Sequence, residues 1–160
     1  MKKTRQPKTE SETNDGLLDE ADGRRLAQNE LRESEERFRH LYNDTPVMLH
    51  SIDQSGRLIS VSNYWLEVLG YGRSEVLGRK STEFLTEASR RYAEEVVLPD
   101  YFKTGFCKDV PYRIATKSGK TIDVLLSATA ERNDSGEIIR SLAVLTDVTE
   151  RKRADRKSVV

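Results

Sequence analysis

The sequence has one cysteine, two histidines and no long apolar run, and each shortage excludes a class of protein. The lone Cys107 permits neither an intrachain disulfide nor a cysteine-based zinc site. No apolar stretch approaches the roughly 18 residues that a membrane-spanning helix needs, and the N-terminus lacks the apolar core of a signal peptide. We therefore expect a cytoplasmic protein with no membrane partner.

A net charge of either sign is also missing, because 27 basic and 27 acidic residues cancel. No global field therefore attracts nucleic acid, and a basic run in residues 151–157 is explained by a solvated helix end.

Catalytic signatures are absent as well. The glycines at 70, 72 and 78 lack the spacing of a phosphate-binding loop, and no Gly-x-Ser-x-Gly motif occurs. We expect neither a nucleic-acid partner nor intrinsic enzymatic activity.

Period-2 patterns in the C-terminal half predict two strands joined as a hairpin. Residues 121–130 place apolar side chains on one face, namely Ile122, Val124, Leu126, Ala128 and Ala130. The opposite face carries Asp123, Ser127 and Thr129. In residues 137–148, the predicted inward side chains are Leu142, Val144 and Val148, in phase with Ile138. Residues 133–136 have the composition of a tight turn between the two strands.

Three more strands and three short helices are predicted upstream of this hairpin. The strands cover residues 47–52, 57–62 and 110–116, next to glycine-containing turns. The predicted helix N-caps are Asn63, Ser74 and Ser89. Gly70 and Gly78 should stop the first two helices, and Pro99 should end or kink the third at Leu98. The order is β-β-α-α-α-β-β-β with a helix at each end, which is an α+β fold.

The N-terminal part is predicted to be a polar, disordered tail over residues 1–16 and an amphipathic helix over residues 17–43. The apolar residues near heptad spacing are Leu17, Leu31 and Phe38 at one position and Ala27 and Leu41 at another. This spacing favours a short two-stranded coiled coil and hence a homodimer. The alternative is one amphipathic helix packed on its own domain. We expect the main domain over residues 44–148 and an exit helix or linker over residues 149–160.

Several motifs, in order along the chain, resemble those of the PAS family, also called S-box sensory domains. They are Ser34–Arg39 before Pro46, Asp53–Ile59, Asn63–Tyr71 with Glu75–Arg79, Lys117–Lys120, and Asp147–Lys152. The resemblance implies a five-stranded antiparallel sheet with short helices on one face, over a small cavity. Domains of this family sense by binding a ligand or by mediating dimerisation, and they transmit through flanking helices.

The resemblance also lets two cofactor chemistries be checked residue by residue. Ser81 stands where the flavin-photoadduct subclass has its cysteine, and a serine forms no flavin thioether. Haem-sensing relatives carry their ligand on the helix that corresponds to residues 89–95, which contains no histidine. His40 and His50 lie elsewhere, and His50 is interpreted as a strand side chain satisfied by a hydrogen bond. We expect no haem and no photoadduct, whereas non-covalent FAD or a small metabolite remains compatible with the family.

Two groups of residues are predicted to form the functional site. The aromatic candidates for a ligand pocket are Trp65, Phe84, Tyr92, Tyr101 and Tyr112, each of which could instead be an apolar anchor of the core. The candidates for a signal-relay junction are Asp147, Thr149 and Arg151, where the last strand passes into the exit helix. Asp147 is expected to accept a charge-assisted bond from an arginine or lysine, and Thr149 to cap the helix. The alternative is an ordinary cap without a signalling role.

These observations predict a stand-alone, non-enzymatic sensory or interaction module in bacterial signal transduction, acting as a homodimer. The expected partner is a separate output protein such as a histidine kinase or a diguanylate cyclase. Two alternatives stay open. One is a dimerisation module that binds no ligand, and the other is a sensor truncated from a longer kinase or cyclase.

Overall fold

The computed structural model describes residues 11–158, and the chain divides into two compact units between Leu41 and Tyr42. The first unit consists of most of helix α1, Ser11–Asp44. The sequence predicts disorder as far as residue 16, but the helix already begins at Ser11, and residues 1–10 lie outside the described residues. The helix therefore begins earlier than the one predicted over residues 17–43, since extending an existing helix by polar residues costs far less than nucleating one.

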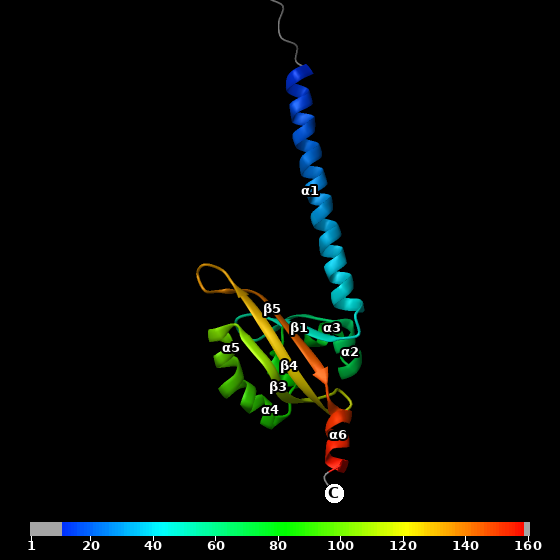
Figure 1. Ribbon diagram of the computed structural model, residues 1–160, viewed down its shortest axis with the longest axis vertical. Helices are drawn as coiled ribbons and strands as arrows, with labels where there is room; N and C mark the ends of the chain where they lie inside the picture. The colour runs from blue at the N-terminus through cyan, green and yellow to red at the C-terminus, as the bar shows by residue number, and fades with distance from the viewer. Residues whose placement is uncertain (1–10, 159–160) are drawn as a thin grey trace, which may run out of the picture. The chain divides into compact units, whose positions relative to one another are not determined.

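The second unit is built on the predicted five-stranded antiparallel sheet (Figure 1), and its strand order is β2-β1-β5-β4-β3. Its strands are β1 Met48–Ile52, β2 Leu58–Val61, β3 Phe106–Ala115, β4 Thr121–Arg132 and β5 Ile138–Asp147. Strand β5 is the last in the chain but occupies the centre, between β1 and β4. The end of this central strand leads directly into the exit helix α6, Thr149–Ser158.

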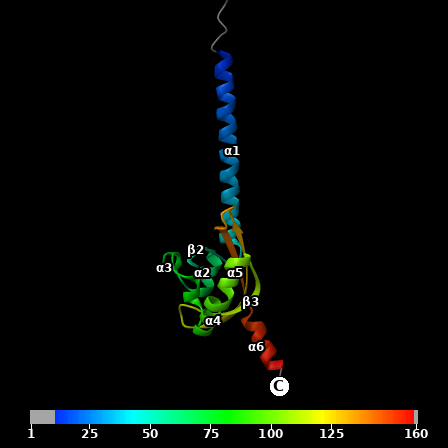
Figure 2. The same ribbon diagram turned by 90° about the vertical axis from the view of Figure 1, so that its left-hand side faces the viewer.

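The helical segments between β2 and β3 lie against one face of the sheet, as Figures 1 and 2 show. They are α2 Asn63–Leu69, α3 Arg73–Val76, the 3-10 turn η1 Ser81–Phe84, α4 Glu87–Tyr92, the π-helical turn η2 Ala93–Val97, and α5 Leu98–Thr104. The helical run changes from π to α at Leu98, beside Pro99, where a break is predicted. Pro99 lies in the first turn of α5, where its missing N–H costs little.

Two of the predicted helix stops are found, but all three predicted N-caps are wrong. Gly70 has a positive φ of 82° at the end of α2, and Gly78 has one of 84°. Helix α2 is capped by Ser62 instead of Asn63, since the buried Ser62 Oγ accepts from Trp65 N–H at 3.3 Å.

The other two serines were also assigned the wrong role. Helix α3 begins after Gly72, whose N–H donates to the Glu75 carboxylate, so Ser74 lies inside the helix. Helix α4 begins at Glu87, and the buried Ser89 accepts a hydrogen bond from Arg113 N–H at 2.8 Å. The Ser89 hydroxyl is therefore bound to β3 and not to the start of a helix.

The two C-terminal strands differ in how well their inward faces are predicted. In β4 the prediction is confirmed, because Val124, Leu126 and Ala128 are buried beneath the helices. In β5 the prediction is wrong by one residue: Ala143 and Leu145 are buried, whereas Leu142 is 37% exposed on the opposite face. Such a shift inverts a strand, because its side chains alternate. The inward face of β5 carries small side chains where the sheet borders a cavity, so residue size misleads the pattern.

Candidate functional site

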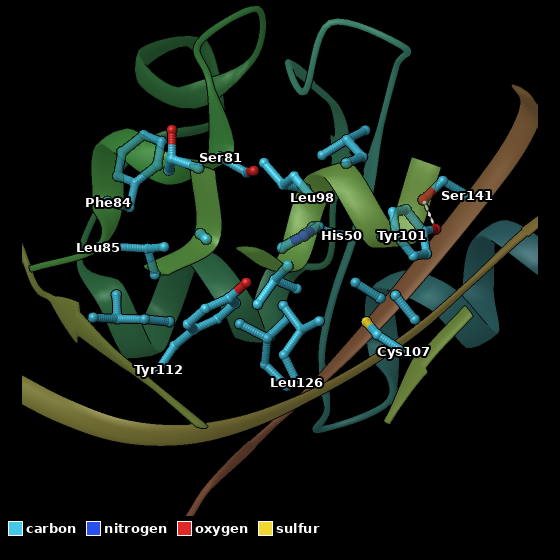
Figure 3. A pocket seen from close by; sticks show the side chains of 18 of the residues that line it. His50, Ser81, Phe84, Leu85, Leu98, Tyr101, Cys107, Tyr112, Leu126 and Ser141 are labelled. Carbon is cyan, nitrogen blue, oxygen red and sulfur yellow. Dashed lines mark hydrogen bonds between the residues drawn. The ribbon is translucent and has the colours of Figure 1, made fainter. Parts of the chain in front are cut away.

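A cavity of about 50 Å³ lies between the sheet and the helices. Figure 3 shows its lining, with His50, Tyr101 and Tyr112 directed into it. The side chains that line it include no aspartate, glutamate, lysine or arginine within the described part of the chain. It is therefore a largely apolar site that contains a few polar groups, the usual character of a small-molecule pocket.

Four of the five aromatic candidates line this cavity: Trp65, Phe84, Tyr101 and Tyr112. Trp65 and Phe84 meet edge to face, with ring centroids 5.5 Å apart, and so fix one wall. Tyr92 does not line it and is 41% exposed. The inward positions of this helical run are Ser89, Ala93 and Val97, spaced four apart, so Tyr92 is rotated away from the sheet.

Two tyrosine hydroxyls, those of Tyr101 and Tyr112, contribute polar groups to the site. Tyr101 Oη and Ser141 Oγ are hydrogen-bonded at 2.8 Å across the cavity wall, which joins α5 to the central strand (Figure 3). Burial raises the pKa of both Tyr101 and Tyr112, so each hydroxyl stays neutral and can donate or accept. Cys107 also lines the cavity, and burial raises the pKa of its thiol.

Two side chains that line the cavity, His50 and Trp65, each have a buried polar atom without a hydrogen-bond partner among the described residues: His50 Nδ1 and Trp65 Nε1. His50 is only 7% exposed, and the prediction that a hydrogen bond satisfies it is not met at Nδ1. The missed signal was the alternation of Met48, His50 and Ile52, which places the imidazole inward with two core side chains. Burial lowers the pKa of His50 to about 4, so the imidazole is neutral at pH 7.

This burial predicts that stability decreases with acid. The pKa of His50 is lower in the folded state than its ordinary value of about 6.5, so the unfolded chain binds more protons between these values. Stability is fully present above about pH 6.5 and is lost as the pH falls toward 4. We expect the free energy of unfolding to fall by about 2 kcal/mol between pH 7 and pH 5, measured by urea titration.

A matched pair of variants isolates this effect from the titration of other groups. His50→Gln should remove the His50 component of the slope, whereas His40→Gln, on an exposed position of α1, should retain it. An equal slope in wild type and His50→Gln would contradict the assignment.

The predicted relay junction is held by hydrogen bonds in which Asp123, not singled out by the sequence, is central. Asp147 Oδ1 accepts from Thr149 N–H at 2.9 Å and from Thr149 Oγ1 at 2.6 Å. The same Thr149 hydroxyl accepts from the Asp123 backbone N–H at 2.9 Å, and Val148 N–H donates to the Asp123 carbonyl at 2.8 Å. Strand β4 is therefore joined to the first turn of α6 through Asp123.

The cations expected at Asp147 pair with Asp123 instead. Arg113 Nε and Lys152 Nζ lie 3.4 and 3.5 Å from Asp123 Oδ1, and this carboxylate is 9% exposed. Arg151, the third predicted junction residue, is exposed on α6. Asp123 escaped prediction because a polar residue in an alternating strand indicates a solvated face, whereas here α6 covers it.

The cavity is small for the cofactors that the resemblance raised. Flavin-sized and haem-sized ligands need sites of at least about 300 Å³, several times the observed volume of about 50 Å³. Ser81 lines the cavity and offers a hydroxyl, not a thiol.

Residues 11–158 bring together no cluster of histidine, cysteine and carboxylate side chains able to hold a metal ion. Within the same residues, no helix has both the length and the apolar character to cross a membrane.

Comparisons with known proteins match this architecture. A family model described as "PAS domain" matches residues 44–150. The PAS domain of an HTR-like protein from Haloarcula marismortui is 27% identical, with a TM-score of 0.60, over 77% of this chain and 98% of that one. An RNA-binding light-oxygen-voltage receptor is 19% identical, with a TM-score of 0.67, over 76% of this chain and 35% of that one. An uncharacterized protein of Sinorhizobium fredii, y4lL, is 26% identical over 145 residues.

A five-stranded sheet, short helices over a cavity and an exit helix define a signal-sensing module of the kind that is generally non-catalytic. The chain belongs to the PAS domain family. The match to y4lL covers 91% of this chain but only 17% of that protein, so the chain corresponds to a small part of its length.

Proposed function

We propose that this chain is a non-enzymatic sensory and interaction module that binds a small ligand in the cavity and relays its state to an output protein. The observation that most directly supports this proposal is that two strands border both the cavity and the junction. On β4, Leu126 and Ala128 line the cavity, and Asp123 binds the first turn of α6. On β5, Ala143 and Leu145 line the cavity, and the strand ends at Asp147.

This connection supplies a physical route for the relay. A ligand that moves the lining residues of β4 also shifts the backbone that holds Asp123, because neighbouring residues of a strand share one hydrogen-bonded ladder. The Asp123 groups bound to α6 then favour a different helix direction. We infer that the output protein is a cytoplasmic histidine kinase or diguanylate cyclase that reads this direction.

A second candidate function, dimerisation without a ligand, is favoured by α1. Leu31 and Leu41 are each 60% exposed and Phe38 is 63% exposed on a helix with near-heptad spacing. A second copy of the helix would cover these side chains. One chain can both dimerise and bind a ligand. The two proposed functions are distinguished by whether a change in the cavity alters the junction.

The test fills the cavity and reads the junction. Ala128→Val adds two methyl groups at the cavity wall, and we expect amide hydrogen exchange at Val148 and Lys152 to change by about threefold or more. The matched control is Ala88→Val, at an exposed position of α4, which should leave both amides unchanged. If Ala128→Val folds and leaves the junction amides as in wild type, the relay is contradicted and the ligand-free module is favoured.

A further inference from the structure

Two side chains that line one cavity have an unsatisfied buried polar atom, and these atoms restrict what could fill it. Trp65 Nε1 and His50 Nδ1 lack partners among the described residues, although the two side chains are 98% and 93% buried (2% and 7% exposed). Buried polar groups in folded proteins are almost always hydrogen-bonded, and a group left without a partner destabilises the fold. A partner that is not part of this chain would remove the cost at both atoms.

The chemistry of each atom restricts that partner. An indole N–H is a donor only, so Trp65 requires a lone pair, as on a carbonyl or hydroxyl oxygen. The neutral imidazole of His50 can donate or accept at Nδ1, depending on its tautomer. A molecule with one acceptor and one further polar group can therefore satisfy both.

The walls restrict its charge and size. Among residues 11–158, the cavity is lined by no acidic or basic side chain other than the neutral His50, so an ion placed there would lose its hydration without gaining a counter-charge. The volume of about 50 Å³ compares with about 30 Å³ for one water molecule in the liquid. Only a molecule of a few non-hydrogen atoms fits without repacking of the core.

We infer that the cavity takes a small uncharged oxygen-containing molecule, such as a short alcohol, ketone or amide, whose oxygen accepts from Trp65 Nε1 and which also pairs with His50 Nδ1. This inference rests on the proposed ligand-sensing function and gives the ligand's chemical class. The inferred ligand differs from flavin and haem, since neither of these groups fits the volume of the cavity.

The test uses two probes of the same shape on the full chain. Acetamide offers a carbonyl acceptor and an amide donor, and isobutene has the same branched outline with no polar atom. Trp65 is the only tryptophan, so a single indole N–H resonance reports on Nε1 directly. We expect acetamide to shift this resonance downfield in a saturable titration, and isobutene to produce no such downfield shift.

Trp65→Phe removes the N–H and keeps an aromatic ring in α2. Relative to wild type, it should weaken acetamide binding about tenfold and change isobutene binding by less than about threefold, because only acetamide loses a hydrogen bond. Binding to the variant is followed by the methyl resonances of Ala128 and Ala143, which line the cavity. If Trp65→Phe does not fold, His50→Leu replaces it, with the same expected contrast between the probes.

Three results would overturn the inference. One is an indole resonance that acetamide leaves unchanged, and another is an equal loss of both probes in Trp65→Phe. The third is a pair of ordered waters on both atoms, seen as water-to-indole cross-peaks, that acetamide does not displace. Each is distinguishable from failure of the proposed function, which is read at the junction amides after Ala128→Val and involves no probe.

Discussion

Ser62→Ala is expected to lower the free energy of unfolding by about 3 kcal/mol, a large effect for the loss of one oxygen atom. The hydroxyl is fully buried and holds three segments together: it accepts from Leu49 N–H at 3.0 Å and from Trp65 N–H at 3.3 Å, and donates to the Val47 carbonyl at 2.8 Å. Alanine would leave these backbone groups without their side-chain partner beneath α2. Urea denaturation followed by circular dichroism measures the change.

The control for this prediction is Ser74→Ala. Ser74 is exposed inside α3 and serves as no cap, so its replacement should change the unfolding free energy by less than about 0.5 kcal/mol. Similar effects of the two substitutions would show that Ser62 does not hold the start of α2 to β1. Because Trp65 is part of the capped turn, Ser62→Ala should also broaden its indole resonance.

Thr149→Val is expected to loosen α6 while leaving the sheet folded. Valine has nearly the same shape, but it cannot accept from Asp123 N–H or donate to Asp147 Oδ1, bonds of 2.9 and 2.6 Å. A cost of about 1.5 kcal/mol corresponds to roughly tenfold faster exchange of the Asp123 amide, if that amide exchanges by local opening. The measurement is residue-resolved amide exchange by NMR.

Thr146→Val provides the comparison for Thr149→Val. Thr146 lies exposed on β5, three residues before Thr149, so its replacement tests for a general effect of removing a hydroxyl. Unchanged exchange at Asp123 in Thr149→Val would contradict the proposed connection between β4 and α6. A uniform increase across β1 and β2 would mean that the junction supports the whole sheet.

The fold could be predicted because its signals are local. Alternation in β4, the turns and the motifs from Ser34 to Lys152 all depend on neighbours in the sequence. Helix stops at glycine could be predicted for the same reason, since a positive φ is a property of one residue. The choice between Ser62 and Asn63 as the cap was not local, because two of the Ser62 partners are distant in the sequence: Leu49 in β1 and Val47 just before it.

The site was predicted less well because its residues depend on partners distant in the sequence. Aromatic size indicated Trp65, Phe84, Tyr101 and Tyr112 as cavity candidates, but size says nothing about the rotation that exposes Tyr92. His50 and Asp123 are polar residues in strands and were taken to be satisfied or solvated. Their burial depends on the helices and on α6, whose placement a strand pattern does not contain.

The position of β5 at the centre of the sheet has a consequence for synthesis. Strand β1 pairs with β5 through Met48 and Leu145, so this pairing can form only after nearly the whole domain has left the ribosome. At about 5–20 residues per second, this separation corresponds to roughly 5–20 s during which the β1–β2 hairpin has an open edge. The sheet is complete, and the cavity is lined on its sheet side, only after β5, the strand that leads into α6, has been synthesised. A nascent chain therefore completes its cavity and the junction between β5 and α6 in the same folding event.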